Sequence, residues 1–303
     1  MARHLNLSVS VPRFRAGLDP MPSLPPIVLT FAASDPTGGA GLQADLLTLA
    51  SMGCHPLSVV TALTVQDTRG VDDLLAIDSD WVVDQARKLL EDMPVAAFKL
   101  GVLGSVENVT AIAEIISDYP SVPVIMDPVL ASGRGDSLAG EDMIIAMREL
   151  IVPQTTVLTP NSIEARRLAE EHEESDEPSL DECASRLVAL GCEFVLITGT
   201  HENTAEVINT LYGESGVVRS DRWKRLPGSF HGSGCTLASA IAATMANGLD
   251  VPEAVREAQE YTWQALAHGF RPGMGQHLPD RFFWARDVEG DGSETPESGR
   301  EGP

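Results

Sequence analysis

Short apolar runs alternate with amphipathic stretches from about residue 25 to residue 200. The runs are rich in β-branched residues and are nearly continuous, which is typical of strands that are buried on both faces of a sheet. They predict strands at 27–34, 57–66, 95–104, 123–130, 155–161 and 193–199.

The segments between these runs have helical periodicity. One face of the segment 41–53 would collect its apolar residues Leu42, Leu46, Leu49 and Ala50. The sequence SLDE at 179–182 is a capping box, and Gly191 is placed to end that helix. Strands that alternate with helices predict an α/β protein of three layers, αβα, with a mostly parallel, doubly wound sheet.

The pattern changes after residue 200. Residues 205–220 predict a hairpin with Gly213 and Gly216 in its turn, and two long helices follow at about 234–247 and 252–268. The chain has no internal repeat and no clear linker. The predicted organisation is a disordered leader at 1–25, a single domain at 26–285 and an acidic disordered tail at 286–303.

Composition narrows the possible partners. The formal net charge of −23 argues against a nucleic-acid partner, because phosphates would be repelled. No apolar run reaches the ~20 residues that cross a bilayer, and the N-terminus has no apolar secretory segment. The four cysteines form no CxxC pair, so a structural metal site is not expected. These features predict a cytoplasmic protein that binds neither nucleic acid nor membrane.

Polar residues follow the predicted strands at their carboxyl ends. In open α/β sheets ligands bind in the crevice at this edge, although loops are polar in any protein. The residues concerned are Ser34-Asp35, Gln66-Asp67, Asp127-Pro128, Thr159-Pro160-Asn161 and Thr198-Gly199.

Two further motifs lie beside this predicted crevice. The sequence SDPTGGAGLQAD at 34–45 is a glycine-rich loop that opens a helix, where backbone can approach a ligand closely. Asn161 and Glu164 are three residues apart at a helix start, so they share one face. They could orient Mg²⁺-bound water near phosphates. Equally, Asn161 could be the N-cap of that helix with Glu164 at its third position.

The sequence HGSGCT at 231–236 places a cysteine behind a tight turn. Amides of residues 233–235 at a helix start could bind a developing negative charge, and the same position favours the thiolate of Cys235. The alternative is that Cys235 is a small apolar residue of the core. A nucleotide site, an anion-binding helix start and a base together suit phosphoryl transfer.

Five motifs resemble the hydroxymethylpyrimidine/phosphomethylpyrimidine kinases of thiamine biosynthesis, in the order found in that family. They lie at 31–71, 99–105, 126–138, 158–165 and 231–243. The resemblance implies a ribokinase-like αβα fold and a kinase that depends on ATP and Mg²⁺. Such an enzyme phosphorylates 4-amino-5-hydroxymethyl-2-methylpyrimidine and then its monophosphate, giving the diphosphate. It also implies a homodimer.

The resemblance assigns roles to individual residues. Cys235 would be the catalytic base, beside an anion hole of Gly232, Ser233 and Gly234. The pyrimidine would lie against Gln66, Asp45, Ala40, Val102 and Val129. The ATP and Mg²⁺ side would consist of Asp127, Asn161, Glu164, Thr198 and Gly199, with Glu164 and Asp127 holding the metal through water. Many relatives have a lysine in place of Thr198, which puts one phosphate contact in question.

Three other functions fit parts of the pattern. Pyridoxal kinase shares the fold and takes a similar flat heteroaromatic substrate. A hydrolase or acyl transferase with Cys235 as nucleophile would need a histidine as base. His231 is only four residues away in the sequence, and no feature of the sequence marks His55 or His201 as the partner instead. A non-catalytic binder of a vitamin precursor would not need Asn161, Glu164 and Cys235.

Overall fold

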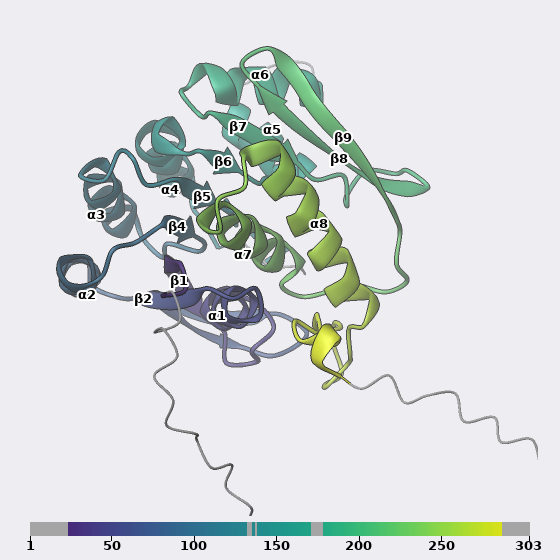
Figure 1. Ribbon diagram of the computed structural model, residues 1–303, viewed down its shortest axis with the longest axis horizontal. Helices are drawn as coiled ribbons and strands as arrows, with labels where there is room; N and C mark the ends of the chain where they lie inside the picture. Colours follow the sequence, from purple (N-terminus) through teal and green to yellow (C-terminus); the bar gives the residue numbers. More distant parts are fainter. Residues whose placement is uncertain (1–23, 132–134, 137, 171–177, 287–303) are drawn as a thin grey trace, which may run out of the picture.

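The computed structural model describes residues 24–131, 135–136, 138–170 and 178–286 (Figure 1). Most of the predicted leader at 1–25 and of the predicted tail at 286–303 lies outside these residues. The proposed division of the chain therefore stays a prediction for those two segments.

The described residues form one nine-stranded sheet in the order β3-β2-β1-β4-β5-β6-β7-β8-β9. The strands from β2 to β7 in this order pair in parallel, while β3 at one edge and β8 and β9 at the other are antiparallel. Their bounds are β1 (Ile27–Ser34), β2 (His55–Gln66), β3 (Val71–Ala76), β4 (Ala97–Leu100), β5 (Val124–Met126), β6 (Val157–Leu158), β7 (Phe194–Ile197), β8 (Glu206–Gly213) and β9 (Gly216–Lys224).

Helices cover both faces of this sheet, as the alternating pattern predicts (Figure 1). On one face α1, α7 and α8 pack, and on the other α2 to α6. The bounds are α1 (Gly41–Ser51), α2 (Ser79–Asp92), α3 (Val106–Ser117), α4 (Glu141–Ala146), α5 (Ser162–Ala169), α6 (Leu180–Ala189), α7 (Ser233–Ala246) and α8 (Val251–Ala267). A π-helical segment, η1 (Met147–Ile151), and two short 3₁₀ helices, η2 (Val152–Gln154) and η3 (Phe283–Ala285), complete the set. The three-layer αβα architecture is confirmed.

Local signals set several helix ends. The Ser179 side chain accepts a hydrogen bond from the N–H of Glu182 and begins α6, and Gly191 follows its end with a φ of 112°. One prediction for α1 is wrong, because Ala50 is exposed. The buried face of α1 includes Asp45 and Thr48, and the Asp45 carboxylate accepts a hydrogen bond from the buried Thr30 hydroxyl.

The edge strand β3 was not predicted. Its sequence VDDLLA carries two acids and has a largely exposed face, so it lacks the continuous apolar run of the central strands. It pairs with β2 up to Gln66, and the register shifts between Val65 and Gln66. Such an irregularity re-aims side chains locally.

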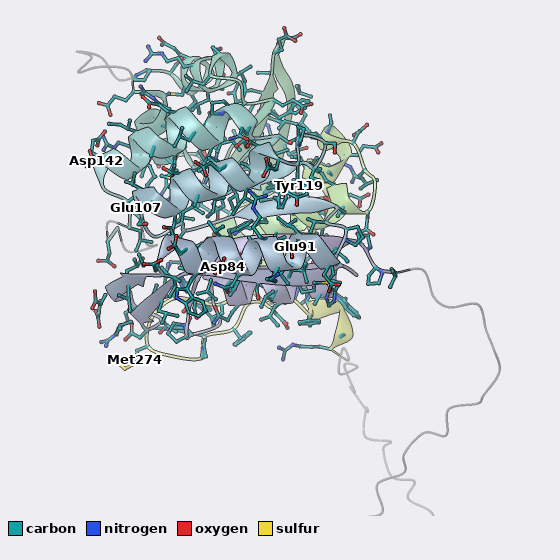
Figure 2. The ribbon with its side chains drawn as sticks, turned by 90° about the vertical axis from the view of Figure 1, so that its left-hand side faces the viewer. Asp84, Glu91, Glu107, Tyr119, Asp142 and Met274 are labelled. Atoms are coloured by element: carbon teal, nitrogen blue, oxygen red, sulfur yellow. The ribbon has the colours of Figure 1, made fainter. Side chains whose placement is uncertain are left out.

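The acidic residues gather on the outer surfaces of the helices. Figure 2 shows Asp84, Glu91, Glu107 and Asp142 projecting from α2, α3 and α4 toward solvent. Beneath these helices the sheet supplies wholly buried residues such as Phe31 and Phe98. These four carboxylates therefore carry their charge at the surface.

Candidate active site

A cavity of about 970 Å³ runs along the carboxyl edge of the sheet. Its lining begins with residues of β2 and β3 and reaches β8 and β9, so the cavity crosses almost the whole sheet. Asp35, Asp127 and Thr198 line it from the ends of three strands. This is the crevice that the polar strand ends predict. Its volume suits a small molecule or a nucleotide.

Two loops meet at one wall of the cavity without room for side chains between them. Gly232, the N-cap of α7, has a φ of 82°, and a Cβ there would lie 1.9 Å from the carbonyl oxygen of Gly39. A Cβ on Gly234 would lie 3.3 Å from an oxygen of Asp127. Glycine is thus required at Gly232, and Ser233 opens a fourteen-residue helix whose first N–H groups have no partner within the helix.

Arg281 links the Gly39 loop to the first turn of α7. Its guanidinium donates to the carbonyl oxygens of Gly39 at 2.6 Å and Gly38 at 3.4 Å, and to the Thr236 hydroxyl at 3.1 Å. Arg281 is almost completely buried. Arg281 carries no local sequence signal for this role, because it lies 45 residues beyond Thr236 in the chain.

A buried ion pair lies beneath the loops. Lys99 of β4 and Asp45 of α1 are both fully buried, and Lys99 Nζ lies 2.8 and 2.9 Å from the two Asp45 carboxylate oxygens. Burial is the largest influence on the pKa of Lys99 and lowers it, but the electrostatic interactions with Asp45, Cys235 and Asp127 and the hydrogen bond to Asp45 together raise the pKa above its usual value. Lys99 lines the cavity and Asp45 does not.

Asp45 is therefore not placed to hold the pyrimidine. Its two oxygens accept hydrogen bonds from Lys99, from the Thr30 hydroxyl at 2.8 Å and from the Ser239 hydroxyl at 2.8 Å. Every donor belongs to the protein, so the expected substrate contact is corrected to a structural one. The signal for Lys99 was a lysine in an apolar strand of a chain where only three of 21 basic residues are lysines.

Cys235 lies in the cavity wall beside this pair, but its thiol is not activated as expected. Burial raises the pKa of Cys235 strongly, and the carboxylates of Asp127 and Asp45 add to the rise. Lys99 and a hydrogen bond from the Gly41 N–H oppose it without cancelling it. The prediction that the helix start favours a resting thiolate is wrong, because burial and two carboxylates outweigh a helix dipole.

Asn161 and Glu164 form a capping box at the start of α5. The Asn161 side chain accepts from the N–H groups of Ile163 and Glu164, and a Glu164 oxygen accepts from the Asn161 N–H at 2.9 Å. Both residues also line the cavity, so the two interpretations of the motif are compatible. Burial and the nearby Asp127 raise the pKa of Glu164 to about 8.

The residues around Asp127 and Glu164 fit a magnesium ion that is held mainly by phosphate oxygens and water, with few protein ligands. Asp127 is nearly buried, its Oδ2 has no hydrogen-bond partner in the described part of the chain, and burial raises its pKa. Within those same residues no group of three or more His, Cys, Asp or Glu side chains could form a complete protein cage. One or two carboxylates with phosphate oxygens and water is the arrangement that Mg²⁺ prefers.

Thr198 and Gly199, the two residues after β7 that were expected to contact ATP, differ in their position relative to the cavity. Thr198 lines the cavity, whereas Gly199 does not. The Gly199 N–H donates to the side chain of Asn209 at 3.1 Å, and a Cβ there would lie 2.3 Å from a backbone oxygen of Ile208. Gly199 is therefore needed for close packing of β8, and its expected contact with ATP is corrected.

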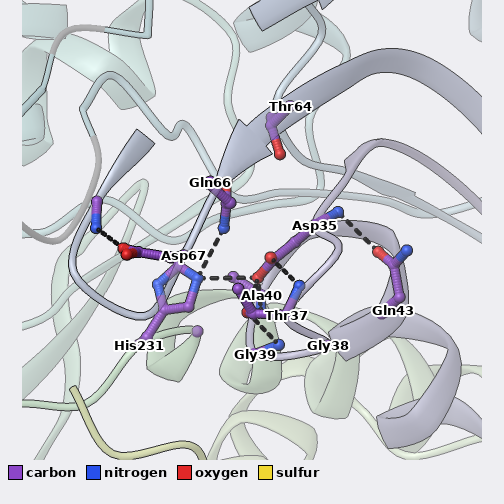
Figure 3. Close-up of polar contacts among 12 residues, drawn as sticks. Asp35, Thr37, Gly38, Gly39, Ala40, Gln43, Thr64, Gln66, Asp67 and His231 are labelled. Atoms are coloured by element: carbon purple, nitrogen blue, oxygen red, sulfur yellow. Dashed lines mark hydrogen bonds and ion pairs between the residues drawn. The ribbon is translucent and has the colours of Figure 1, made fainter. Parts of the chain in front are cut away.

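At the other end of the cavity lies the expected ring site. Ala40, Val102 and Val129 line it together with Gln66. The Gln66 side chain is next to His231, which lies 2.9 Å from Asp35 (Figure 3). His231 is thus engaged by Asp35 and Gln66 rather than by Cys235, which removes support from the nucleophilic hydrolase.

The part of the cavity beside β9 and α8 is lined by aromatic and basic side chains. Trp223 and Trp263 stack with ring centroids 6.5 Å apart, and the basic residues Lys224 and Arg225 lie in the same stretch of the lining. Aromatic faces and cations suit a nucleotide. In the part of the chain that the structure covers, no helix combines the length and apolar character needed to cross a bilayer.

Comparison with known proteins agrees with this geometry. A family model described as phosphomethylpyrimidine kinase matches residues 35–280. The chain is 39% identical over 258 residues to a hydroxymethylpyrimidine/phosphomethylpyrimidine kinase of Streptomyces coelicolor, which covers 84% of this chain and 93% of that protein. It is 37% identical over 261 residues to a thiamine biosynthesis bifunctional protein of Geobacter sulfurreducens, covering 86% of this chain and 53% of that longer protein.

Among solved structures, an ADP complex of Bacillus subtilis pyridoxal kinase superposes with a TM-score of 0.77. It is 28% identical, and the match covers 86% of this chain and 99% of that one. The likeness confirms the ribokinase-like fold that the motifs imply.

Proposed function

This chain belongs to the phosphomethylpyrimidine kinase family, and on that premise we propose which residues along the cavity carry out its reaction. The chain is a hydroxymethylpyrimidine/phosphomethylpyrimidine kinase of thiamine biosynthesis, with ATP as phosphoryl donor. It phosphorylates 4-amino-5-hydroxymethyl-2-methylpyrimidine and the monophosphate of that pyrimidine. The observation that carries the assignment of residues is one cavity that joins a glycine-bounded helix start, two carboxyl groups and an amide-bearing apolar end.

We assign the transferred phosphoryl group to the start of α7. The N–H groups of Ser233, Gly234 and Cys235 point outward there, and Gly232 keeps the backbone open to a large anion. These donors are fixed by the close approach of Gly232 to Gly39 and by the contacts of Arg281 with Gly39 and with Thr236 of α7. Preformed donors of this kind stabilise charge that develops during phosphoryl transfer.

Asp127, Glu164 and Asn161 are assigned to the ATP and Mg²⁺ side, and Thr198 to the phosphates. Mg²⁺, when bound with the triphosphate, would neutralise charge on the phosphate oxygens. Asp127 offers a buried oxygen that has no hydrogen-bond partner among the described residues, and Glu164 must lose a proton before its carboxylate can contribute. Both carboxyl groups would contact the metal through water, because few protein ligands converge here.

Cys235 remains our candidate for the group that accepts the proton of the substrate hydroxyl. Because its pKa is raised, the resting thiol is protonated and must lose its own proton first. The ammonium of Lys99 favours that loss. We therefore expect kcat to rise with pH into the alkaline range. The loose transition state of phosphoryl transfer needs little prior activation of the alcohol, so the gain from Cys235 is modest.

Pyridoxal phosphorylation is a second candidate activity, favoured by the structural likeness to pyridoxal kinase. An assay of ATP consumption with the hydroxymethylpyrimidine, with pyridoxal and without an acceptor separates the possibilities. The proposal predicts consumption that depends on the pyrimidine and continues to the diphosphate. Consumption with pyridoxal alone would contradict it, and no consumption with either acceptor would favour a binding protein.

We also propose that the enzyme is a cytoplasmic homodimer, since the family resemblance implies one. Light scattering of the purified chain tests the dimer, and a monomer at all concentrations would refute it.

A further inference from the structure

The loop after β1 gathers hydrogen-bond donors around one carboxylate, that of Asp35 (Figure 3). Its Oδ1 accepts from the Thr37 N–H at 2.8 Å, and its Oδ2 accepts from the Thr37 hydroxyl at 2.9 Å and the Ala40 N–H at 2.7 Å. The Thr37 oxygen in turn accepts from the Gly39 N–H at 3.1 Å, so its hydrogen is left for Asp35. The Asp35 carboxylate is surrounded by donors and acts only as an acceptor.

The charge state of Asp35 agrees with this geometry. The side chain is only 3% exposed, and burial alone would raise its pKa. The hydrogen bonds from His231, Thr37 and Ala40 outweigh burial, and the net shift of the pKa is downward. Asp35 is therefore ionised and accepts from every neighbour.

His231 joins this carboxylate to Gln66. The Nε2 atom of His231 lies 2.9 Å from Asp35 Oδ2 and 3.0 Å from the side-chain nitrogen of Gln66. An ionised Asp35 requires a hydrogen on His231 Nε2, and a ring nitrogen that carries a hydrogen has no lone pair left to accept one. A second donor at 3.0 Å would then be repelled.

The partners decide which end of the Gln66 amide faces the histidine, because the oxygen and nitrogen ends have the same shape. Only the carbonyl oxygen can share the hydrogen of His231 Nε2 with Asp35. The NH₂ group then faces away from His231. Gln66 lines the cavity, so this group is available to a bound ring.

We propose that Asp35 and His231 are positioning residues that fix the Gln66 amide with its oxygen on His231 and its NH₂ group toward the substrate. The proposal rests on the proposed function, in which Gln66 contacts the pyrimidine. It specifies the chemistry that the site selects: a planar heteroaromatic alcohol with a ring nitrogen that accepts a hydrogen bond at this point. If the amide were free to rotate, its oxygen would face that nitrogen for part of the time, and two lone pairs would repel.

The proton on His231 can be observed without any substrate. Nitrogen-15 NMR of histidine-labelled, unliganded enzyme distinguishes a ring nitrogen that carries a hydrogen from one that does not. The variant His231→Gln identifies the signal of His231 among the seven histidines. We expect Nε2 of His231 to carry a hydrogen at mildly alkaline pH. A bare Nε2 would overturn the proposal whatever the enzyme's activity.

The effect on recognition is tested with two acceptors: the hydroxymethylpyrimidine, and its analogue with CH in place of the ring nitrogen beside the amine-bearing carbon. The variant His231→Leu should raise KM for the pyrimidine about tenfold, which corresponds to one lost hydrogen bond. Its kcat should change less than about twofold, and its preference for the pyrimidine over the analogue should fall. His231→Gln should restore both, because its Nε2–H can reach the same acceptor.

Two further variants complete the design. Thr37→Val removes one donor to Asp35 and the acceptor of the Gly39 N–H but leaves the Asp35–His231 contact, and we expect wild-type KM and preference. If His231→Leu keeps the wild-type preference, or if Thr37→Val loses it equally, the proposal is wrong. If Gln66→Leu itself has wild-type KM, the proposed ring contact fails and orientation of Gln66 has no consequence for recognition, while NMR still reports whether the hydrogen-bond arrangement exists.

Discussion

The buried pair of Asp45 and Lys99 allows the sharpest test of the structure, because sequence and structure predict different effects for one substitution. If Asp45 held the pyrimidine, Asp45→Asn would mainly raise KM. In the structure it would instead remove the carboxylate that neutralises a fully buried ammonium. Removing one partner of a buried ion pair costs about 3–5 kcal/mol of unfolding free energy. We expect a cost in this range. Asp127 is the other carboxylate that attracts Lys99, and because it also interacts with Cys235 it does not replace Asp45 as the partner of the ammonium.

The assay is thermal and urea unfolding followed by circular dichroism. For a domain of this size, a loss of about 4 kcal/mol lowers Tm by roughly 10 °C. The matched control is Asp84→Asn, the same exchange on the exposed face of α2, which should change stability by less than about 0.5 kcal/mol. The double variant with Lys99→Met should recover much of the loss, because no unpaired charge remains buried. A stable Asp45→Asn enzyme with a strongly raised KM for the pyrimidine would refute this account.

Three further outcomes are expected. Gln66→Leu should weaken pyrimidine binding by about 1–3 kcal/mol and leave ATP binding unchanged, measured by calorimetry; an unchanged pyrimidine affinity would show that Gln66 does not contact the ring. Glu164→Gln should raise the Mg²⁺ requirement. In the wild type the Mg²⁺ requirement should fall as pH rises through about 8, because Glu164 must be ionised to contribute. Equal Mg²⁺ titrations of the wild type and Glu164→Gln would leave Glu164 as a helix cap alone. Cys235→Ala should keep the affinities for ATP and for the pyrimidine within a few-fold and lower kcat by about 10²-fold or less, the lower end for general-base help. The wild-type thiol should be alkylated slowly at neutral pH, because its pKa is raised. Full activity would make Cys235 a core residue, and a covalent intermediate on its sulfur would make it a nucleophile.

The architecture could be predicted from the sequence because its signals are local. Continuous apolar runs such as 27–34 mark strands covered on both faces, and β1 has the predicted bounds. Ser179 and Gly191 mark the ends of α6 through hydrogen bonds and backbone angles that depend on neighbouring residues. The positions of Asn161 and Glu164 on one helical turn follow from spacing alone.

The partners of the site residues could not be predicted in this way. Asp35 and His231 are 196 residues apart and meet only because two loops converge on one edge of the sheet. Arg281 reaches Gly39 across 242 residues, and Lys99 reaches Asp45 from a different layer. Hydrogen-bond partners of this kind are set by packing.

The state of Cys235 shows the same division at a single atom. The sequence by itself determined that the thiol stands at a helix start, and a helix start favours a thiolate. Only the tertiary structure decided how deeply the thiol is buried and that Asp127 and Asp45 lie near it. Loss of solvation and two negative charges outweigh the partial charge of a helix end, so the thiol keeps its proton. Local geometry follows from adjacent residues, whereas the burial of a side chain and the electric field at it depend on residues from the whole fold.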